Sequence, residues 1–373
     1  MARQGANKLL HKAKKSKSDE FYTQYVDIQK EVEAYLEYNP DTFRGKVVYC
    51  NCDDPYESNF FRYFILNFER IGLKRLITTS YKPSPVANTQ LGLFVDNDTD
   101  KQKKGRPKIT ANKFIINSVG DIDGDGEFSL KDVALQLKQN KKNEWAPLDG
   151  EGDFRSPESI ELLKQADYVI TNPPFSLFKE FIKQLVDYDK KFLIIANINA
   201  ITYKEVFPLI KKNKVWLGTG MGRWISGFIV PKSYELYGTE ARIDEDGNRI
   251  VATNNCLWFT NLDHGKRHQI LPLMTMNDNI KFSSHKDVKG VGYKKYDNFN
   301  AIEVPYTDSI PSDYDGVMGV PITFLDKYNP EQFEIIGCSY DYGRPDGWNN
   351  DINMSVSVDG VNVYKRLLIK RKN

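Results

Sequence analysis

Residues 168–198 read YVITNPPFSLFKEFIKQLVDYDKKFLIIANI, a segment with two apolar runs around a rigid corner and a helical pattern. Tyr168–Thr171 has the composition of a short buried strand, and 192–198 (FLIIANI) has that of a second one. Between them, apolar side chains recur at helical spacing, at Leu177, Phe178, Phe181, Ile182, Leu185 and Val186. Strand, helix and strand in this order predict a parallel sheet with crossover helices.

The upstream segment 45–81 shows the same alternation of strand and helix. It reads as strand 46–52, turn Asp53-Asp54-Pro55, helix 58–71 and strand 74–79. A further helix is expected after Ser156, because serine is a good N-cap residue and Pro157 suits the first helical position. We therefore expect a doubly wound, mainly parallel α/β sheet.

Two parts of the chain depart from this pattern. Residues 82–150 are polar, with prolines, Asn and Asp runs and a lysine cluster, which predicts an insertion rather than another sheet unit. From about residue 264, short strands and Gly/Asp/Asn turns predict an irregular C-terminal region. We thus expect a basic arm at 1–20, an α/β domain at 21–263 and a second region at 264–373.

Composition excludes several classes of protein. The chain has 373 residues, 40% of them hydrophobic and 27% charged, so it is neither disordered throughout nor too small for its own core. No apolar run approaches the roughly 20 residues that span a bilayer, and no secretory signal is recognisable at the N-terminus. Four cysteines are too few for a disulfide scaffold. We expect a cytoplasmic protein that does not enter a membrane.

Basic residues cluster although the net charge is only +2, from 52 basic and 50 acidic residues. Residues 1–17 and the last ten residues contain cations and no acid, and 101–108 (KQKKGRPK) forms a third cluster. Such clusters are either solvated faces or sites that neutralise nucleic-acid phosphates.

The corner Asn172-Pro173-Pro174-Phe175 carries the clearest chemistry. It follows a buried strand and precedes a helix, and ligands bind at such strand ends in open α/β sheets. An exocyclic or amide nitrogen is a poor nucleophile, because its lone pair is delocalised. The Asn172 side-chain oxygen and the Pro173 carbonyl offer two acceptors for its hydrogens, and Phe175 offers a face for stacking. The alternative is that the prolines only end a strand and that Phe175 is core.

Eight segments, in order, resemble the adenine-specific DNA methyltransferases of the EcoRI type. They are KLLHKAKKSKSDEFYTQY, VVYCNCDDP, GDFRS, TNPPFSLFKE, FLIIAN, ITYKEVF, SGFIVP and YELYGTEARI. The resemblance implies a Rossmann-like, S-adenosylmethionine-dependent methyltransferase fold and N6 methylation of an adenine flipped out of duplex DNA. It also implies that 264–373 is a target-recognition region. A restriction-modification system is the expected setting, in which a cognate endonuclease is paired in function but not by contact.

Carried over from the family, Phe21-Tyr22-Thr23 resembles the motif at the methionine end of the cofactor, where the Thr23 hydroxyl would bond the carboxylate. Asp53-Asp54-Pro55 stands at the turn of the first cofactor motif, although the glycines usual there are absent. The strand 74–79 does not end in the acid that normally holds the ribose, so the ribose contact is unassigned.

Asp153-Phe154 resembles the motif in which an acid accepts from the cofactor's adenine amine and an aromatic ring packs on its base. Asp153 is equally suited to cap the helix near Ser156. Phe228, in SGFIVP, is a candidate second stacking face for the target adenine, with core packing as the alternative.

The segment 121–132 (DIDGDGEFSLKD) has the spacing of an EF-hand loop. Its ligands would be Asp121, Asp123, Asp125, Glu127 and Asp132. The last position is Asp rather than the usual Glu, so the segment predicts either a structural calcium site or a surface turn rich in Asp and Gly.

Two other functions fit the same residues. The Asn-Pro-Pro-Phe loop also suits methylation of RNA or of a protein glutamine, which present the same planar amino group. A non-catalytic DNA-binding protein that retains the fold is the rival from another class, and the missing glycines of the first cofactor motif favour it.

Overall fold

The computed structural model describes two compact units, each with its own core. The described residues are 22–52, 58–81, 111–122, 124, 132, 142–220, 225–230, 236, 241–245, 247–251, 255–349 and 356–372. Unit 1 comprises Met1–Ile198 and Gly220–Leu262, and unit 2 comprises Asn199–Thr219 and Asp263–Asn373. Among the helices of the described residues, none is both long and apolar enough to cross a membrane.

A large mixed β-sheet forms the centre of unit 1. Within the unit its strands follow the order β5-β4-β3-β2-β6-β7-β12. The four central strands are parallel, whereas the pairs β3–β4, β4–β5 and β7–β12 are antiparallel. The sheet is therefore more mixed than expected. The strands are β2 (Val47–Cys50), β3 (Arg75–Thr79), β4 (Asn112–Ile116), β5 (Glu144–Pro147), β6 (Tyr168–Thr171), β7 (Lys191–Asn197) and β12 (Cys256–Thr260).

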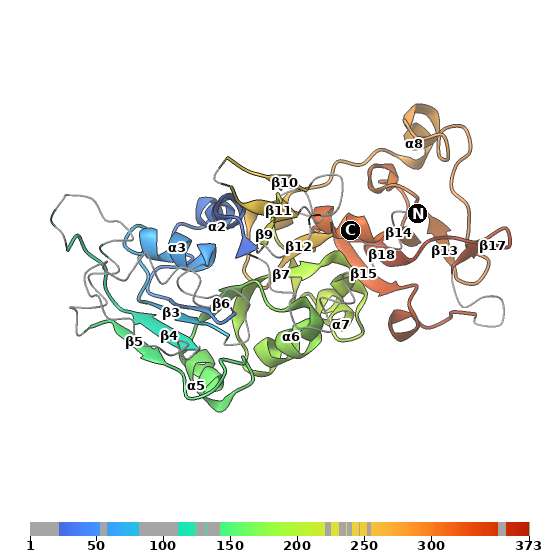
Figure 1. Cartoon of the computed structure of the whole chain (residues 1–373). Helices are drawn as coiled ribbons and strands as arrows, with labels where there is room; N and C mark the ends of the chain where they lie inside the picture. Colours follow the sequence, from blue (N-terminus) through green and yellow to red (C-terminus); the bar gives the residue numbers. More distant parts are fainter. Residues whose placement is uncertain are drawn as a thin grey trace. The chain divides into compact units, whose positions relative to one another are not determined.

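Helices cover both faces of this sheet, with α2 and α3 on one side and α5 and α6 on the other (Figure 1). Alternate strand residues, among them Val48 and Ile170, join the apolar cluster with α2 and α3. On the opposite face, the Phe259 ring of β12 lies 5.8 Å from that of Phe178 in α6. The helices are α2 (Tyr25–Tyr38), α3 (Asn59–Leu66), α5 (Pro157–Gln165) and α6 (Phe178–Asp187).

Two serine caps fix where crossover helices begin. The Ser58 hydroxyl accepts from the backbone N–H groups of Phe60 and Phe61, and the Ser156 hydroxyl accepts from that of Ser159 at 3.2 Å. Each such cap stabilises a helix by about 1 kcal/mol. The helix start expected after Ser156 is confirmed.

A second sheet in unit 1 joins distant parts of the chain, in the order β1-β9-β11-β10. Thr23 of β1 lies opposite Phe228 of β9 in this register. The strands are β1 (Tyr22–Thr23), β9 (Phe228–Val230), β10 (Arg242–Ile243) and β11 (Arg249–Val251).

The segment 82–150 does not stand apart from the sheet as expected. Its strands β4 and β5 extend the sheet at the edge formed by β3. The edge strand β5 lacks an apolar pattern, because an edge strand has solvent-facing residues and its four side chains are all at least partly exposed. The lysine cluster at 101–108 lies outside the described residues.

Unit 2 is less irregular than its sequence suggests. It contains a four-stranded sheet in the order β13-β14-β18-β15, in which β13 and β14 are parallel and the other pairs antiparallel. Short strands and a bulge between Ile335 and Gly337 obscure the alternation. The elements are α7 (Phe207–Lys211), β8 (Trp216–Leu217), α8 (Met276–Phe282), β13 (Ala301–Glu303), β14 (Val317–Pro321), β15 (Phe333–Cys338), β16 (Ser357–Val358), β17 (Val361–Asn362) and β18 (Arg366–Arg371).

Candidate active site

The Asn172-Pro173-Pro174-Phe175 corner lies at the carboxyl end of β6. Pro173 is buried, and Asn172, Pro174 and Phe175 are partly buried. A short 3-10 turn follows, closed by a bond from the Leu177 N–H to the Pro174 carbonyl at 3.0 Å, and leads directly into α6. The two proline rings restrict the backbone at this turn. The corner is therefore held by the sheet on one side and by a helix on the other.

A pocket of about 300 Å³ opens beside this corner. Its walls come from the ends of β2, β3 and β6 and from the loop before α5, which is where an open α/β sheet binds its ligands. The lining residues are Asn51, Cys52, Tyr81, Gly152, Asp153, Phe154, Pro174 and Leu177. The structure thus brings Asp153 and Phe154, about 20 positions upstream in the sequence, next to Pro174.

Gly152 brings this loop against the end of β3. Its φ is +79°, and a Cβ at this position would lie only 1.9 Å from the Ser80 carbonyl oxygen. Only glycine adopts this conformation at this separation without displacing backbone. The close approach sets the position of the next two residues, Asp153 and Phe154.

The Asp153 carboxylate is held by Arg155. The Arg155 guanidinium donates to both carboxylate oxygens, at 2.9 and 2.7 Å, and also to Glu180 of α6 at 2.6 Å. These two carboxylates raise the pKa of Arg155. The helix cap is Ser156, so Asp153 does not serve as the N-cap residue of α5.

Phe154 is 4% exposed and its ring meets Phe181 edge-on, with 5.0 Å between centroids. Phe228 is 1% exposed and belongs to the core cluster, and its ring lies 6.3 Å from the ring of Phe175 at 70°. Both aromatic residues therefore pack within unit 1, and the half-buried Phe175 is the more accessible of the pair at the corner.

Thr23 lies in β1 with its side chain 3% exposed. Its hydroxyl oxygen is buried and finds no hydrogen-bond partner within the described part of the chain, although the Thr23 carbonyl accepts from the Asn59 side chain at 2.8 Å. Burying a hydroxyl without a partner costs free energy, which a ligand acceptor at this position would offset. This orphaned hydroxyl fits a carboxylate of the cofactor.

Two side chains near Thr23 tie β1 to β9. Gln24 donates to the Ser226 hydroxyl at 2.7 Å and to the Gly227 carbonyl at 2.9 Å. Asp27 accepts from the Ser226 N–H at 2.9 Å, and burial raises the pKa of this carboxyl. The segments FYTQY and SGFIVP are thereby joined in space.

Several expected site residues cannot be placed. Asp53, Asp54, Pro55 and Phe21 of the cofactor motifs lie outside the described residues, as does the side chain of Tyr22. Asp123, Asp125 and Glu127 of the calcium-like loop do so too, whereas Asp121 and Asp132 are described. The described residues contain no cluster of three or more possible metal-binding side chains.

Sequence reasoning missed Asn51, Cys52, Tyr81 and Leu177 of the pocket wall, and it quoted Gly152 without a role. The first three follow directly after β2 or β3. Their position after a parallel strand was the available signal, because carboxyl ends of parallel strands meet at one edge. Tyr81 lies just beyond the end of β3, near the position where the family normally has the acid that holds the ribose.

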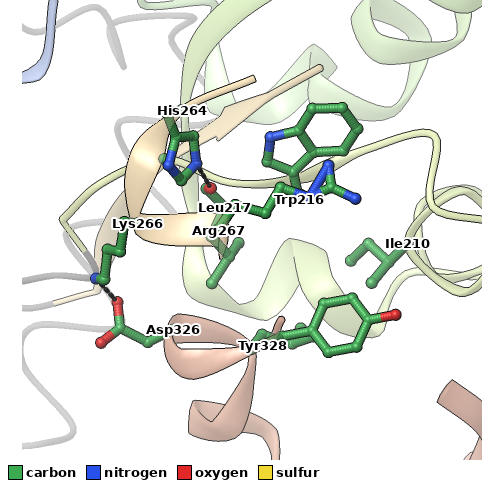
Figure 2. A pocket seen from close by; sticks show the side chains of 10 residues that line it. Ile210, Trp216, Leu217, His264, Lys266, Arg267, Asp326 and Tyr328 are labelled. Carbon is green, nitrogen blue, oxygen red and sulfur yellow. Dashed lines mark hydrogen bonds and ion pairs between the residues drawn. The ribbon is translucent and has the colours of Figure 1, made fainter. Parts of the chain in front are cut away.

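A second pocket, of about 390 Å³, lies within unit 2 and contains no expected site residue (Figure 2). The Arg267 guanidinium stacks over the Trp216 ring at 3.6 Å, and Lys266 pairs with Asp326. His264 bonds the Leu217 carbonyl at 2.9 Å, and burial lowers the pKa of this imidazole to about 4. His264 is therefore a neutral structural residue.

The corner contains two oxygen acceptors, the Asn172 side chain and the Pro173 carbonyl, and its Pro174 lines the pocket. This combination suits transfer of a group to a planar amine without a nucleophile or a metal. The fold and this corner together define the class of amino-group methyltransferases. The family model described as adenine-specific methyltransferase EcoRI matches residues 9–372, and the chain belongs to this family. It is thus an adenine-specific methyltransferase.

Curated relatives match the chain over almost its whole length. The type II methyltransferase M.EcoRI of Escherichia coli is 50% identical over 372 residues, covering 100% of this chain and 99% of the relative. The type II methyltransferase M.MpnI of Mycoplasma pneumoniae is 34% identical, covering 97% and 98%. M.MgeORF184P of Mycoplasma genitalium, also a type II methyltransferase, is 33% identical with the same coverage. No solved structure matches the chain significantly.

Proposed function

We propose that this enzyme methylates N6 of an adenine rotated out of duplex DNA, with S-adenosylmethionine as methyl donor. The observation that carries the proposal is the position of the Asn172–Pro173 corner beside the strand-end pocket of unit 1. Helices on both faces of a sheet with parallel central strands support a doubly wound methyltransferase fold. A restriction-modification system in the cytoplasm, with a separately encoded cognate endonuclease, is the proposed setting.

The corner acts on the adenine amine. The Asn172 side-chain oxygen and the Pro173 carbonyl accept the two amine hydrogens, which draws the lone pair out of conjugation with the ring. As the nitrogen attacks, both oxygens face the positive charge that develops on it and stabilise the transition state. The prolines hold these acceptors before the substrate arrives, so little reorganisation is required. Phe175 supplies the stacking face for the base.

The residues around the pocket fit the cofactor. When bound, S-adenosylmethionine supplies an electrophilic methyl group on a sulfonium. Asp153 and Phe154 line the pocket, where Asp153 would accept from the amine of the cofactor's adenine and Phe154 would pack against that base. Thr23, which lies outside the pocket lining, would donate its buried hydroxyl hydrogen to the cofactor carboxylate. Phe21, Tyr22 and the Asp53-Asp54-Pro55 turn complete the proposed set, and Phe228 remains a candidate for base stacking.

The proposed division of labour follows the chain. Residues 21–263 carry catalysis, 264–373 recognise the target and the basic arm 1–20 contributes phosphate contacts. Neighbouring cations release counterions when they bind DNA, so such an arm would add salt-dependent affinity.

Methyl transfer to different acceptors tests the proposed function. Tritiated S-adenosylmethionine is incubated with the enzyme and duplex DNA, RNA or a glutamine-containing protein. Label in duplex DNA, recovered as N6-methyladenine, is the expected result. Label in RNA or protein instead would contradict it, and failure of saturating S-adenosylmethionine to raise the melting temperature would favour a non-catalytic DNA-binding protein.

A structural calcium ion at 121–132 is a further proposal. The Asp121 carboxylate accepts from the Gly124 N–H at 2.7 Å, and the buried Asp132 carboxylate accepts from the Ile122 N–H at 2.8 Å. The second bond brings the two ends of the loop together, as a calcium loop requires. Calorimetric titration with calcium should show binding that Asp121→Ala abolishes, and absence of heat with the unmodified protein would remove the ion.

A further inference from the structure

The segment 275–295 of unit 2, which we name the α8 lobe, is strongly basic. It contains five lysines and two aspartates, at Lys281, Lys286, Lys289, Lys294, Lys295, Asp278 and Asp287. Figure 1 shows α8 standing apart from β13, β14 and β18. The formal charge of the lobe is +3 (five minus two), compared with +2 for the whole chain. The lobe's own residues thus carry excess positive charge, while the neighbouring segment 307–315 adds Asp308, Asp313 and Asp315, of which Asp308 bonds His285 and Asp313 bonds the Met276 N–H.

The acids of the lobe are bonded within unit 2. Asp278 accepts from the Thr275 hydroxyl at 2.7 Å, and Asp287 accepts from the Tyr306 hydroxyl at 2.9 Å. Their charges are therefore engaged by hydroxyl donors and not by the lysines.

The lysines, in contrast, face solvent. Lys281, Lys286, Lys289 and Lys295 are exposed, and none of them forms an ion pair with any residue that the structure describes. The remaining one, Lys294, pairs with Asp359 at 2.8 Å, where both side chains are more than half exposed. Cations that are exposed and clustered attract a polyanion more strongly than isolated cations do.

The lobe is rigid enough to present these charges in a fixed arrangement. Asn279 is fully buried and donates to the Ser309 carbonyl, which also accepts from the Tyr293 hydroxyl at 2.6 Å. The His285 ring stacks on that of Tyr306, with 3.6 Å between centroids and 7° between planes. Because these contacts are made by Asn279, His285 and Tyr293 and not by the lysines themselves, the lysines need not break a contact when a partner binds.

Two large apolar side chains lie exposed among the lysines. Phe282, the last residue of α8, is 68% exposed, and Val291 is 60% exposed. Apolar surface beside clustered cations suits a partner that presents both anionic and apolar surface. Nucleic acid does so, because phosphates alternate with sugars and base edges.

We propose that the α8 lobe is a duplex-DNA contact surface in which Lys281, Lys286, Lys289 and Lys295 neutralise backbone phosphates and Phe282 packs against sugar or base edges. This inference rests on the proposed function and goes further, because it assigns the contact to a segment that carries no recognised motif. The lysines supply affinity that depends on salt and little on sequence, and Phe282 supplies a contact independent of salt.

Equilibrium binding of the full chain to a fluorescein-labelled DNA duplex tests the surface. In K286Q/K289Q, affinity should fall about tenfold, and the slope of log affinity against log salt should become shallower by about two between roughly 50 and 200 mM salt. The matched control is K164Q/K183Q, which removes two exposed lysines of unit 1 that pair with Glu161 and Asp187. The control should bind as the unmodified chain does.

Phe282→Ser separates the apolar contact from the ionic one. It should weaken duplex binding several-fold with the salt slope unchanged. Both variants should melt at the unmodified temperature, because the substituted side chains are exposed. Unchanged affinity and slope in K286Q/K289Q would overturn the inference, and so would a larger loss of affinity for an RNA duplex than for DNA.

The methyl-transfer assay distinguishes the two possible failures. If the unmodified enzyme labels no duplex DNA, the proposed function is wrong whatever the variants do. If it labels duplex DNA and K286Q/K289Q does so with the same KM, the enzyme is as proposed but the α8 lobe is not its contact surface. The expected result is a raised KM for DNA with an unchanged kcat.

Discussion

The unit 1 pocket and the unit 2 pocket differ in which elements build their walls. The two are of similar volume, about 390 Å³ in unit 2 and about 300 Å³ in unit 1, and in unit 2 Lys266 is paired with Asp326 and His264 with a backbone carbonyl. The unit 1 pocket is built from strand ends and a glycine loop, next to the Asn172 corner. Size therefore does not identify the ligand site. The better guide is whether the walls come from the carboxyl ends of parallel strands.

The largest effect is expected for Asn172→Ala. Loss of one preorganised acceptor should reduce methyl transfer at least about a hundredfold, while DNA affinity is retained. Single-turnover methylation and equilibrium DNA binding measure the two quantities. Normal methylation by the variant would show that Asn172 is not the acceptor and would weaken the distinction between the pockets.

Gly152→Ala tests whether the unit 1 pocket depends on backbone contact. The added Cβ would lie 1.9 Å from the Ser80 carbonyl oxygen at a positive φ. We expect the free energy of unfolding to fall by about 3 kcal/mol and stabilisation by S-adenosylmethionine to be lost. Gly150→Ala is the matched control, because its Cβ would meet nothing within 4 Å. Equal denaturation curves for the two variants would refute the argument.

His264→Asn tests whether the unit 2 pocket is structural. Burial holds the His264 pKa at about 4 in the folded chain, below its ordinary value of 6.5. As the pH falls, the unfolded chain therefore binds a proton before the folded chain does. The free energy of unfolding, which has its full value above about pH 6.5, decreases towards pH 4 by up to about 3 kcal/mol. The variant should show a smaller loss in urea titrations across this range. Loss of cofactor binding in the variant would instead link this pocket to the ligand.

Thr23→Val should have the smallest effect. A hydrogen bond to a charged group contributes about 1.5–3 kcal/mol, so the Kd for S-adenosylmethionine should rise at least about tenfold. The melting temperature of the free protein should not fall, because the hydroxyl has no partner among the described residues. Thr260→Val is the contrasting control: its hydroxyl donates to Phe192 at 2.8 Å, so this variant should lose stability but not cofactor affinity.

Local signals were sufficient for the core of unit 1. The strand expected at 168–171 is β6 at the same residues, because a run of four residues between two helices is too short for a helix and favours a buried strand. The N-cap at Ser156 could likewise be predicted from the sequence. The strands within 82–150 and the sheet of unit 2 could not be predicted in this way, since edge strands and bulged strands lose the apolar pattern that identifies a strand.

For the candidate site, residues with a chemical role could be recognised in the sequence, but the residues that contact them in space could not. Asn172 and Asp153 carry chemical signals in their own segments, and the position after a strand marks where a ligand would lie. Nothing local to Gly152 indicates that it meets Ser80, because that contact exists only when β3 and the loop before α5 lie side by side. The hydrogen bonds from Arg155 to Asp153 and Glu180 likewise form together only when α6 lies beside the loop before α5.

The amino-acid sequence alone determined the alternation of strands and helices, the acceptor corner and the family to which the chain belongs, because these depend on residue types at short spacing. Tertiary structure alone decided which strand ends share a pocket, which hydroxyl is buried without a partner and which lysines stay unpaired. Those properties arise from contacts between segments far apart in the chain, and such contacts are set by sheet order and packing.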